Sequence, residues 1–268
     1  MYLIPENFET YLESTINEVK NIKGHLPKRD LRFLCFLGMI PTTSGEVLEI
    51  GSFRGKSTVA LAKSVEFFDI KNKINAVDPF ILESVTDPLY KSEIPIKDEF
   101  LNNLKDHNVE NKVEFFHMKS EELGKIWNKK IRLLWIDGDH TYHGAKTDLE
   151  TFLPYLKKGA IVAFHDVLNT FDGPVRVVAE QILLSEKFGS FGFCGSIGWG
   201  QYIGEPNECE NYYKEKLKYY KKLHRLVPYV ALNPKKKDTN LMYKLNRALI
   251  PHDEIQPNEW IKKVKFFN

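Results

Sequence analysis

The fold is decided by Val47-Leu-Glu-Ile-Gly-Ser-Phe-Arg-Gly-Lys-Ser57. Its first four residues form a short, mostly apolar run that predicts a strand, and the residues from Ser57 onward have the spacing of a helix. Gly51 and Gly55 therefore fall at a strand-to-helix turn, where open α/β sheets bind their ligands. The stretch predicts a ligand-binding glycine loop at the edge of a parallel sheet.

The residues that follow this loop alternate between short apolar runs and helical segments, which is typical of βαβ units. We predict strands at 46–50, 73–77, 113–117, 131–136 and 160–164, and a final strand pair at 190–193 and 199–203. Helices are expected at 57–68, 96–108, 121–126, 145–156 and 175–187. The predicted fold class is α/β, a Rossmann-like, doubly wound, mostly parallel seven-stranded sheet.

Three parts are expected along the chain: an N-terminal helical cap at 1–44, the sheet domain at 45–205 and a helical extension at 206–268. The cap holds two amphipathic helices, at 6–22 and 28–39. The extension from residue 207 carries 14 Lys and Arg against 7 Asp and Glu, whereas the whole chain has a net charge of only +2. We therefore treat the basic extension as a separate feature.

The composition points to an ordinary globular protein, with 43% hydrophobic and 28% charged residues. The longest apolar run, 31–41, is much shorter than the roughly 20 residues of a membrane-spanning helix. The N-terminus lacks the pattern of a secretory signal, so a cytoplasmic location is expected. Three cysteines without CxxC spacing indicate neither a disulfide framework nor a zinc site.

Three kinds of glycine loop compete at Gly51. In a P-loop, a glycine would stand where Ile50 is, and Glu49 would face the phosphates. A dinucleotide fold would have G-x-G-x-x-G, whereas this loop is G-x-x-x-G. An acid before the first glycine suits a ligand with an ammonium group, such as the methionine part of S-adenosylmethionine (SAM), whose carboxylate takes N–H groups at the helix start. Asp78, at the end of the second strand, is placed to accept ribose hydroxyls.

Four motifs together resemble one family. They are Glu49-Ile-Gly-Ser-Phe-Arg-Gly55, Asp78, Trp135-Ile-Asp-Gly-Asp-His-Thr-Tyr142 and Phe164-His-Asp166. They resemble the class I SAM-dependent methyltransferases, in the subgroup of the macrocin-type and catechol-type O-methyltransferases, over about 45–203. The resemblance implies cofactor contacts at Glu49, Gly51, Ser52, Gly55, Asp78, Ser120 and Asp137. Ser120 has an alternative role as a cap of the next helix.

The fourth and fifth strands deliver Asp137, Asp139, His140 and Asp166 to the same rim as the glycine loop. Methyl transfer to a hydroxyl requires a base, and His140 suits that role at neutral pH because the ordinary pKa of histidine is near 6.5. Asp139 is an alternative base, or the group that orients His140. The competing interpretation of Asp-Gly-Asp-His is a tight turn without a catalytic role.

The resemblance also implies a divalent ion, Mg²⁺, held by Asp137 and Asp166 and bound to the acceptor oxygen. The family has its third ligand immediately after the second acid, where this chain has Val167. His165 and Asn169 are the candidate substitutes for that ligand. Metal dependence therefore stays open at this point.

We predict an O-methyltransferase acting on a hydroxyl of a small acceptor, with a sugar or glycan favoured by the subgroup resemblance. The Tyr- and Lys-rich segment 211–226 is either a packed helix, with surface for a homodimer, or a site for an anionic acceptor. The charges show no nucleic-acid-binding motif. Two other functions compete: a non-catalytic SAM-fold binding or assembly protein, and a metal-dependent hydrolase or hydroxylase using Asp137 and Asp166.

Overall fold

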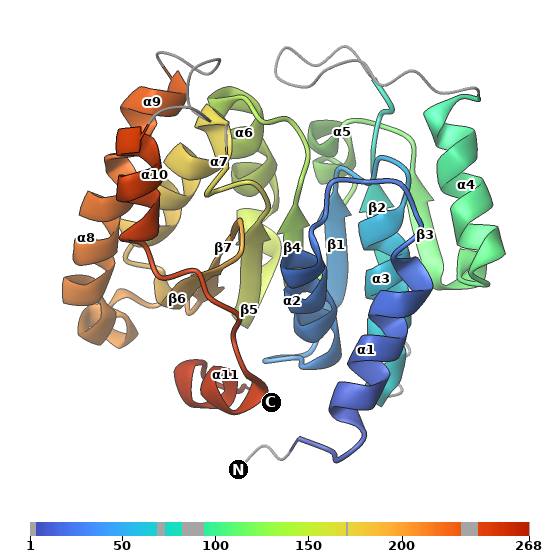
Figure 1. Cartoon of the computed structure of the whole chain (residues 1–268), viewed down its shortest axis with the longest axis horizontal. Helices are drawn as coiled ribbons and strands as arrows, with labels where there is room; N and C mark the ends of the chain where they lie inside the picture. Colours follow the sequence, from blue (N-terminus) through green and yellow to red (C-terminus); the bar gives the residue numbers. More distant parts are fainter. Residues whose placement is uncertain (1–3, 69–72, 82–93, 170, 232–240, 268) are drawn as a thin grey trace.

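The computed structural model describes residues 4–68, 73–81, 94–169, 171–231 and 241–267. Its centre is a seven-stranded sheet in the order β3-β2-β1-β4-β5-β7-β6 (Figure 1). The strands are β1 (Glu46–Ile50), β2 (Ile74–Val77), β3 (Val113–Phe116), β4 (Ile131–Ile136), β5 (Leu156–Phe164), β6 (Phe188–Cys194) and β7 (Ile197–Tyr202). The first five are parallel, and β7 runs antiparallel to both β5 and β6. The predicted mostly parallel α/β fold is confirmed.

Helices cover both faces of the sheet (Figure 1). They are α1 (Phe8–Val19), α2 (Lys28–Met39), α3 (Lys56–Ser64), α4 (Ile96–Asp106), α5 (Ser120–Gly124), α6 (Tyr142–Phe152), α7 (Asp172–Val177), α8 (Glu210–His224), α9 (Val227–Ala231), α10 (Leu241–Ala248) and α11 (Pro257–Lys263). Because side chains alternate along a strand, Val47 belongs to the core under α1 to α4, whereas Leu48 belongs to the core under α5 to α10. Burial on both faces explains the near-continuous apolar strands.

Several boundaries differ from the sequence prediction. The helix expected at 145–156 ends at Phe152, because Pro154 stands in the 3-10 turn that follows. β5 then begins at Leu156, ahead of the predicted residue 160. The predicted helix at 175–187 begins earlier, at Asp172, and continues beyond α7 as a π-helical turn, Val178–Leu183.

The two ends of the described chain pack on the central domain. Leu12 and Phe36, from α1 and α2, lie in the same core as the sheet residues. Near the C-terminus, Trp260 is fully buried against Trp199, with 4.6 Å between ring centroids. The Pro-Lys-Lys-Lys break at 234–237 lies outside the described residues. None of the described helices combines the length and apolar character needed to cross a bilayer.

The strand register brings the functional segments together. Ile50 of β1 pairs with Val77 of β2 and with Ile136 of β4, which in turn pairs with Phe164 of β5. The residues that follow these four strand ends therefore emerge at one edge of the sheet. This edge carries the site.

Candidate active site

A cavity of about 970 Å³ opens at this edge of the sheet. The residues after β1, β2, β4 and β5 line it, together with residues 23–27, between α1 and α2. The volume is near the upper end of the range of small-molecule sites, so a nucleoside cofactor and a small acceptor fit together.

The glycine loop lies against the backbone that follows β4. Gly51 has φ +83°, and a Cβ added to it would lie 2.2 Å from the carbonyl oxygen of Asp137. Only glycine fits this position, because a side chain would meet fixed backbone and favour a different φ. The second glycine, Gly55, also has a positive φ and precedes α3. The loop thereby keeps its backbone open to the cavity.

Asp78 holds the loop in place. Its Oδ2 accepts hydrogen bonds from the N–H groups of Ser52 and Phe53, both at 2.8 Å, and its Oδ1 accepts one from Phe80 N–H at 2.6 Å. Burial raises the pKa of this carboxyl, while the three N–H donors act against the shift. The carboxyl lines the cavity, and a carboxylate oxygen has room for about two donors, so Oδ1 keeps capacity for a ligand hydroxyl.

Glu49 lies behind the loop, which differs from the expected contact with a ligand ammonium group. It is fully buried and is absent from the residues that line the cavity. Its Oε2 accepts hydrogen bonds from Ser52 Oγ at 3.1 Å and from Thr58 Oγ1. Burial raises its pKa to about 7. Glu49 therefore connects β1, the glycine loop and α3 from within the core, and the Ser52 side chain is turned toward it.

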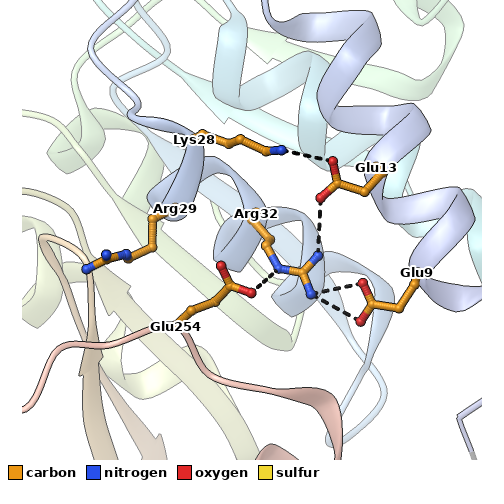
Figure 2. A pocket seen from close by; sticks show the side chains of 6 residues that line it. All are labelled: Glu9, Glu13, Lys28, Arg29, Arg32 and Glu254. Carbon is orange, nitrogen blue, oxygen red and sulfur yellow. Dashed lines mark hydrogen bonds and ion pairs between the residues drawn. The ribbon is translucent and has the colours of Figure 1, made fainter.

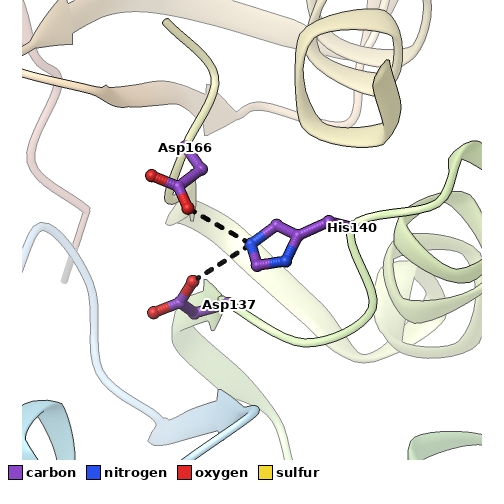
Figure 3. Close-up of side chains that lie close together, drawn as sticks. All are labelled: Asp137, His140 and Asp166. Carbon is purple, nitrogen blue, oxygen red and sulfur yellow. Dashed lines mark ion pairs between the residues drawn. The ribbon is translucent and has the colours of Figure 1, made fainter. Parts of the chain in front are cut away.

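Asp137, His140, His165 and Asp166 form the centre of the site. Figure 3 shows the His140 ring pointing its Nε2 at both carboxylates, 3.4 Å from Asp166 Oδ2 and 3.6 Å from Asp137 Oδ1. The ring also stacks on Phe171, with 4.2 Å between centroids. His140, His165 and Asp166 are all buried. The structure thus assembles residues from two strand ends around one imidazole.

His165 supplies a counter-charge for the two carboxylates. Its Nδ1 lies 3.1 Å from Asp137 Oδ1 and 3.5 Å from Asp166 Oδ1. Burial opposes its protonation, but the two carboxylates raise the pKa of the ring well above its ordinary value. In return, the neighbouring histidines lower the pKa of Asp137 despite its burial. The two carboxylates therefore favour the protonated form of the His165 ring.

Asp139 has a local partner. Its Oδ1 accepts the N–H of Thr141 at 2.9 Å, and its Oδ2 accepts the Thr141 hydroxyl at 3.0 Å. Thr141 in turn caps α6 by accepting the N–H of Gly144. The carboxylate thus stabilises the turn, as in the non-catalytic interpretation. The acids that pair with His140 are Asp137 and Asp166, whereas the sequence had suggested Asp139 as the orienting group.

The ligand atoms of Asp137, His140 and Asp166 lie within 4.8 Å of one another, as the ligands of a metal ion would. This set includes an imidazole nitrogen, whereas the Mg²⁺ site that the resemblance implies is made of oxygen ligands. Val167 is buried in the core and offers no ligand, while the amide nitrogen of Asn169 donates a hydrogen bond to Asp166 Oδ1. His165 Nδ1 also lies within 3.5 Å of both carboxylates that would bind the ion, and a protonated ring would compete with the ion for them.

The sequence analysis missed Asp148. This residue of α6 is buried, lines the cavity and accepts a hydrogen bond from Ser120 Oγ. Burial raises the pKa of Asp148 to about 7. Ser120 is the first residue of α5, next to the N-cap Lys119. The sequence contained one indication that Asp148 is buried: it lies on the same face of the helix as the apolar residues Ala145 and Leu149.

A second missed residue, Asp30, reaches the site from α2. Its Oδ2 lies 3.4 Å from His165 Nε2, and the same carboxylate accepts hydrogen bonds from the N–H and hydroxyl of Ser196. Gly195 allows this approach, because a Cβ there would meet Asp30 Oδ1 at 1.7 Å. Asp30 sits in a helix with no active-site motif around it, so no local pattern could have indicated it.

A second hollow lies between α1, α2 and the C-terminal segment (Figure 2). Its charged lining is paired internally, since Arg32 contacts Glu9 at 2.9 Å, Glu13 at 3.6 Å and Glu254 at 2.8 Å. These ion pairs join three segments that are distant in sequence. We therefore interpret the charged residues of this hollow as ion pairs that stabilise the packing of these segments.

Residues 48–167 match a protein family described as "Methyltransferase domain". This part of the chain is a methyltransferase domain. It runs from Leu48 in β1 to Val167 after β5, and so contains the glycine loop, Asp78 and the Asp–His centre. The resemblance to class I SAM-dependent methyltransferases that the motifs carry is thereby confirmed for this region.

Solved structures share the fold of the methyltransferase domain and its surroundings. Cofactor-bound Rv0187 from MTB is 14% identical, with 73% of this chain and 91% of that chain covered and a TM-score of 0.51. The TDP-rhamnose 3′-O-methyltransferase of calicheamicin biosynthesis is 15% identical, with 75% and 96% covered and a TM-score of 0.50. At these identities the likeness establishes the fold alone.

One curated relative, the uncharacterized protein y4gI of Sinorhizobium fredii, is 40% identical over 47 residues. The match covers 18% of this chain and 5% of that protein. The chain therefore spans only a small part of the length of this relative.

Proposed function

We propose that the chain transfers a methyl group from SAM to a hydroxyl group of a small acceptor. One observation carries the proposal: the matched methyltransferase domain places its glycine loop and the buried imidazole of His140 in one cavity. Two proteins of the same fold are described as cofactor-bound and as a sugar O-methyltransferase, in agreement with this proposal.

The cofactor would lie across the glycine loop. Gly51 allows close approach of the backbone, and Asp78 Oδ1 would accept a ribose hydroxyl. Ser120 and Asp148 form a polar pair on the cavity wall formed by α5 and α6. Glu49 would act indirectly, by fixing the loop from behind.

His140 is the proposed general base. Its Nε2 faces the carboxylates of Asp137 and Asp166, an arrangement that favours the tautomer with the proton on Nε2 and makes Nδ1 the basic atom. SAM supplies an electrophilic methyl group: the acceptor oxygen bonds to its carbon while the carbon–sulfur bond breaks and leaves a neutral thioether. The hydroxyl proton moves to His140, and the two carboxylates stabilise the resulting imidazolium.

We further propose that the acceptor is a sugar or glycan hydroxyl, near an anionic group. Lys56 lines the cavity, and burial lowers the pKa of its ammonium group; among the described residues, no acid opposes this shift. An acceptor carrying phosphate or carboxylate would supply the missing negative charge. The sugar assignment draws on the subgroup resemblance and on the sugar methyltransferase that shares the fold.

Methyl transfer from isotope-labelled SAM to two acceptor sets tests the proposal, with sugar nucleotides in one set and catechols in the other. We expect labelled product from the sugar set, and we expect His140→Asn to abolish it while binding of S-adenosylhomocysteine (SAH) is retained. Binding of SAH without turnover of either set would indicate the non-catalytic alternative. A SAM-independent reaction that a chelator stops would indicate the hydrolase or hydroxylase alternative.

A further inference from the structure

The C-terminal extension carries an exposed apolar surface outside the methyltransferase domain. Leu241, Met242, Leu245 and Leu249 are 68%, 54%, 52% and 51% exposed. The helical spacing of α10 places these four side chains on one face, opposite the buried Tyr243 and Ile250. We call these four residues the α10 face. Clustered exposed apolar side chains of this kind mark a contact surface more often than a chance feature.

Basic residues outnumber acidic residues on α8 and α10. The described residues 210–231 and 241–251 hold eight Lys and Arg against two Glu, and one of the eight, Lys216, is buried. Lys244 lies on α10 itself and is exposed. Lys222 of α8 donates a hydrogen bond to the backbone oxygen of Leu249 at 2.6 Å, so the basic helix α8 contacts the end of the α10 face.

An apolar face bordered by cations matches the interface of an anionic lipid bilayer, where acyl chains take up the apolar side chains and headgroups attract the lysines. A second copy of this chain is a poorer match. Two copies joined through the α10 face would bring two basic surfaces together, because Lys and Arg outnumber Glu by eight to two in these stretches.

The opposite, buried side of α10 contacts the active-site segment. The Tyr243 hydroxyl donates hydrogen bonds to the backbone oxygens of Leu168, at 3.1 Å, and Asn169. Asn169 lines the cavity and binds Asp166. α9 packs against α7, and Figure 1 shows α10 below α9 on the side of the sheet that ends in β7 and β6. We propose that the α10 face docks the protein on an anionic membrane surface, next to its catalytic cavity.

Sedimentation with lipid vesicles tests this directly. The full chain should bind vesicles that contain phosphatidylserine, and should bind pure phosphatidylcholine at least about fivefold more weakly. Leu245→Glu should weaken binding about tenfold or more, because it places a charge in the apolar layer. Met242→Glu should do the same, and it replaces the first variant if that variant does not fold. Ile126→Glu, at a residue 63% exposed after α5, is the matched control and should bind like the wild type.

Three outcomes would overturn the proposal. The first is no binding of the wild type to phosphatidylserine vesicles, and the second is an equal loss in Leu245→Glu and Ile126→Glu. The third is a protein that does not bind vesicles but associates with itself, and loses this association in Leu245→Glu. That result would assign the α10 face to contact with a second copy. SAH titration of Leu245→Glu separates this proposal from the catalytic one, since the α10 face lies outside the cavity and cofactor affinity should not change.

Discussion

Asp137 and His165 form an ion pair in the wall of the cavity, with 3.1 Å between Oδ1 and Nδ1. Replacing Asp137 by Asn should lower the free energy of unfolding by about 3 kcal/mol at neutral pH, because it leaves a buried imidazolium without its closest carboxylate. Denaturant unfolding measures the change. Asp106→Asn, at the exposed end of α4, is the control and should have little effect. Equal stability of Asp137→Asn and the wild type would show that the pair is not ionised.

The same pair predicts a pH window. The lowered pKa of Asp137 stabilises the fold above the ordinary carboxyl value of 3.8, and this contribution is lost as the pH falls through the lowered pKa. The raised pKa of His165 stabilises the fold fully below the ordinary value of 6.5, and this contribution is lost as the pH rises through the raised pKa. The difference between Asp137→Asn and wild type should therefore be largest between these two values.

The raised pKa of Glu49 predicts that the protein loses stability as the pH rises, whereas the lowered pKa of Asp137 predicts a loss as the pH falls. Its pKa is raised to about 7 by burial, so the protonated form contributes stability below the ordinary value of 4.5 that is lost as the pH rises through 7. Glu49→Gln should reduce the fall in stability between pH 5 and pH 8 by about 2 kcal/mol. Unfolding at both pH values measures it. An unchanged pH dependence in the variant would contradict the assignment.

Gly51 predicts a steric effect on cofactor binding. Gly51→Ala should weaken SAH binding by about tenfold or more, because its Cβ would displace the backbone at Asp137 and strain the loop by about 1–3 kcal/mol. Gly24→Ala is the matched control at the same cavity, since its Cβ would meet only the flexible side chain of Lys56, at 3.4 Å. Similar affinities of the two variants for SAH would argue against cofactor binding at the loop.

His140 predicts a loss of rate without a loss of cofactor. His140→Asn should lower kcat about 100-fold or more while changing the SAH dissociation constant less than about twofold. His143→Asn, from the same cavity, serves as the control because His143 is exposed and is not one of the paired groups around Asp137. A parallel loss in both variants would remove His140 from the role of base.

The charge balance around His165 predicts that methyl transfer needs no divalent ion. Treatment with EDTA should change the rate less than about twofold, because the imidazolium already neutralises the paired carboxylates of Asp137 and Asp166. Adding Mn²⁺ or Mg²⁺ back should have no larger effect. Loss of activity in EDTA and recovery with either ion would contradict this prediction.

The sheet was predictable because its strands are buried on both faces and their apolar runs are short and regular. Both β1 and β4 begin and end where the sequence predicts. The boundary of β5 was not predictable, since residues 153–156 continue the apolar pattern of α6 while the backbone changes from a helix to a turn. Periodicity alone does not separate these two states.

The candidate site was predictable where its residues sit at strand ends. The sequence placed Asp78, Asp137, His140 and Asp166 on one rim, and the structure brings them into one cavity. The sequence did not show which way the Glu49 side chain points. Side chains alternate between the two faces of a strand, but the sequence does not say which face meets the core and which meets the ligand. Asp30 comes from a helix more than 100 residues away along the chain, where only tertiary packing brings it to His165.

The central claim is that the cavity beside Gly51 binds a sulfonium nucleoside through Asp78. Calorimetric titration with SAH, repeated with Asp78→Asn, tests it most directly. We predict a one-to-one complex with micromolar affinity that the variant weakens about tenfold or more. The absence of heat with SAH, together with binding of a nucleoside triphosphate, would contradict the account.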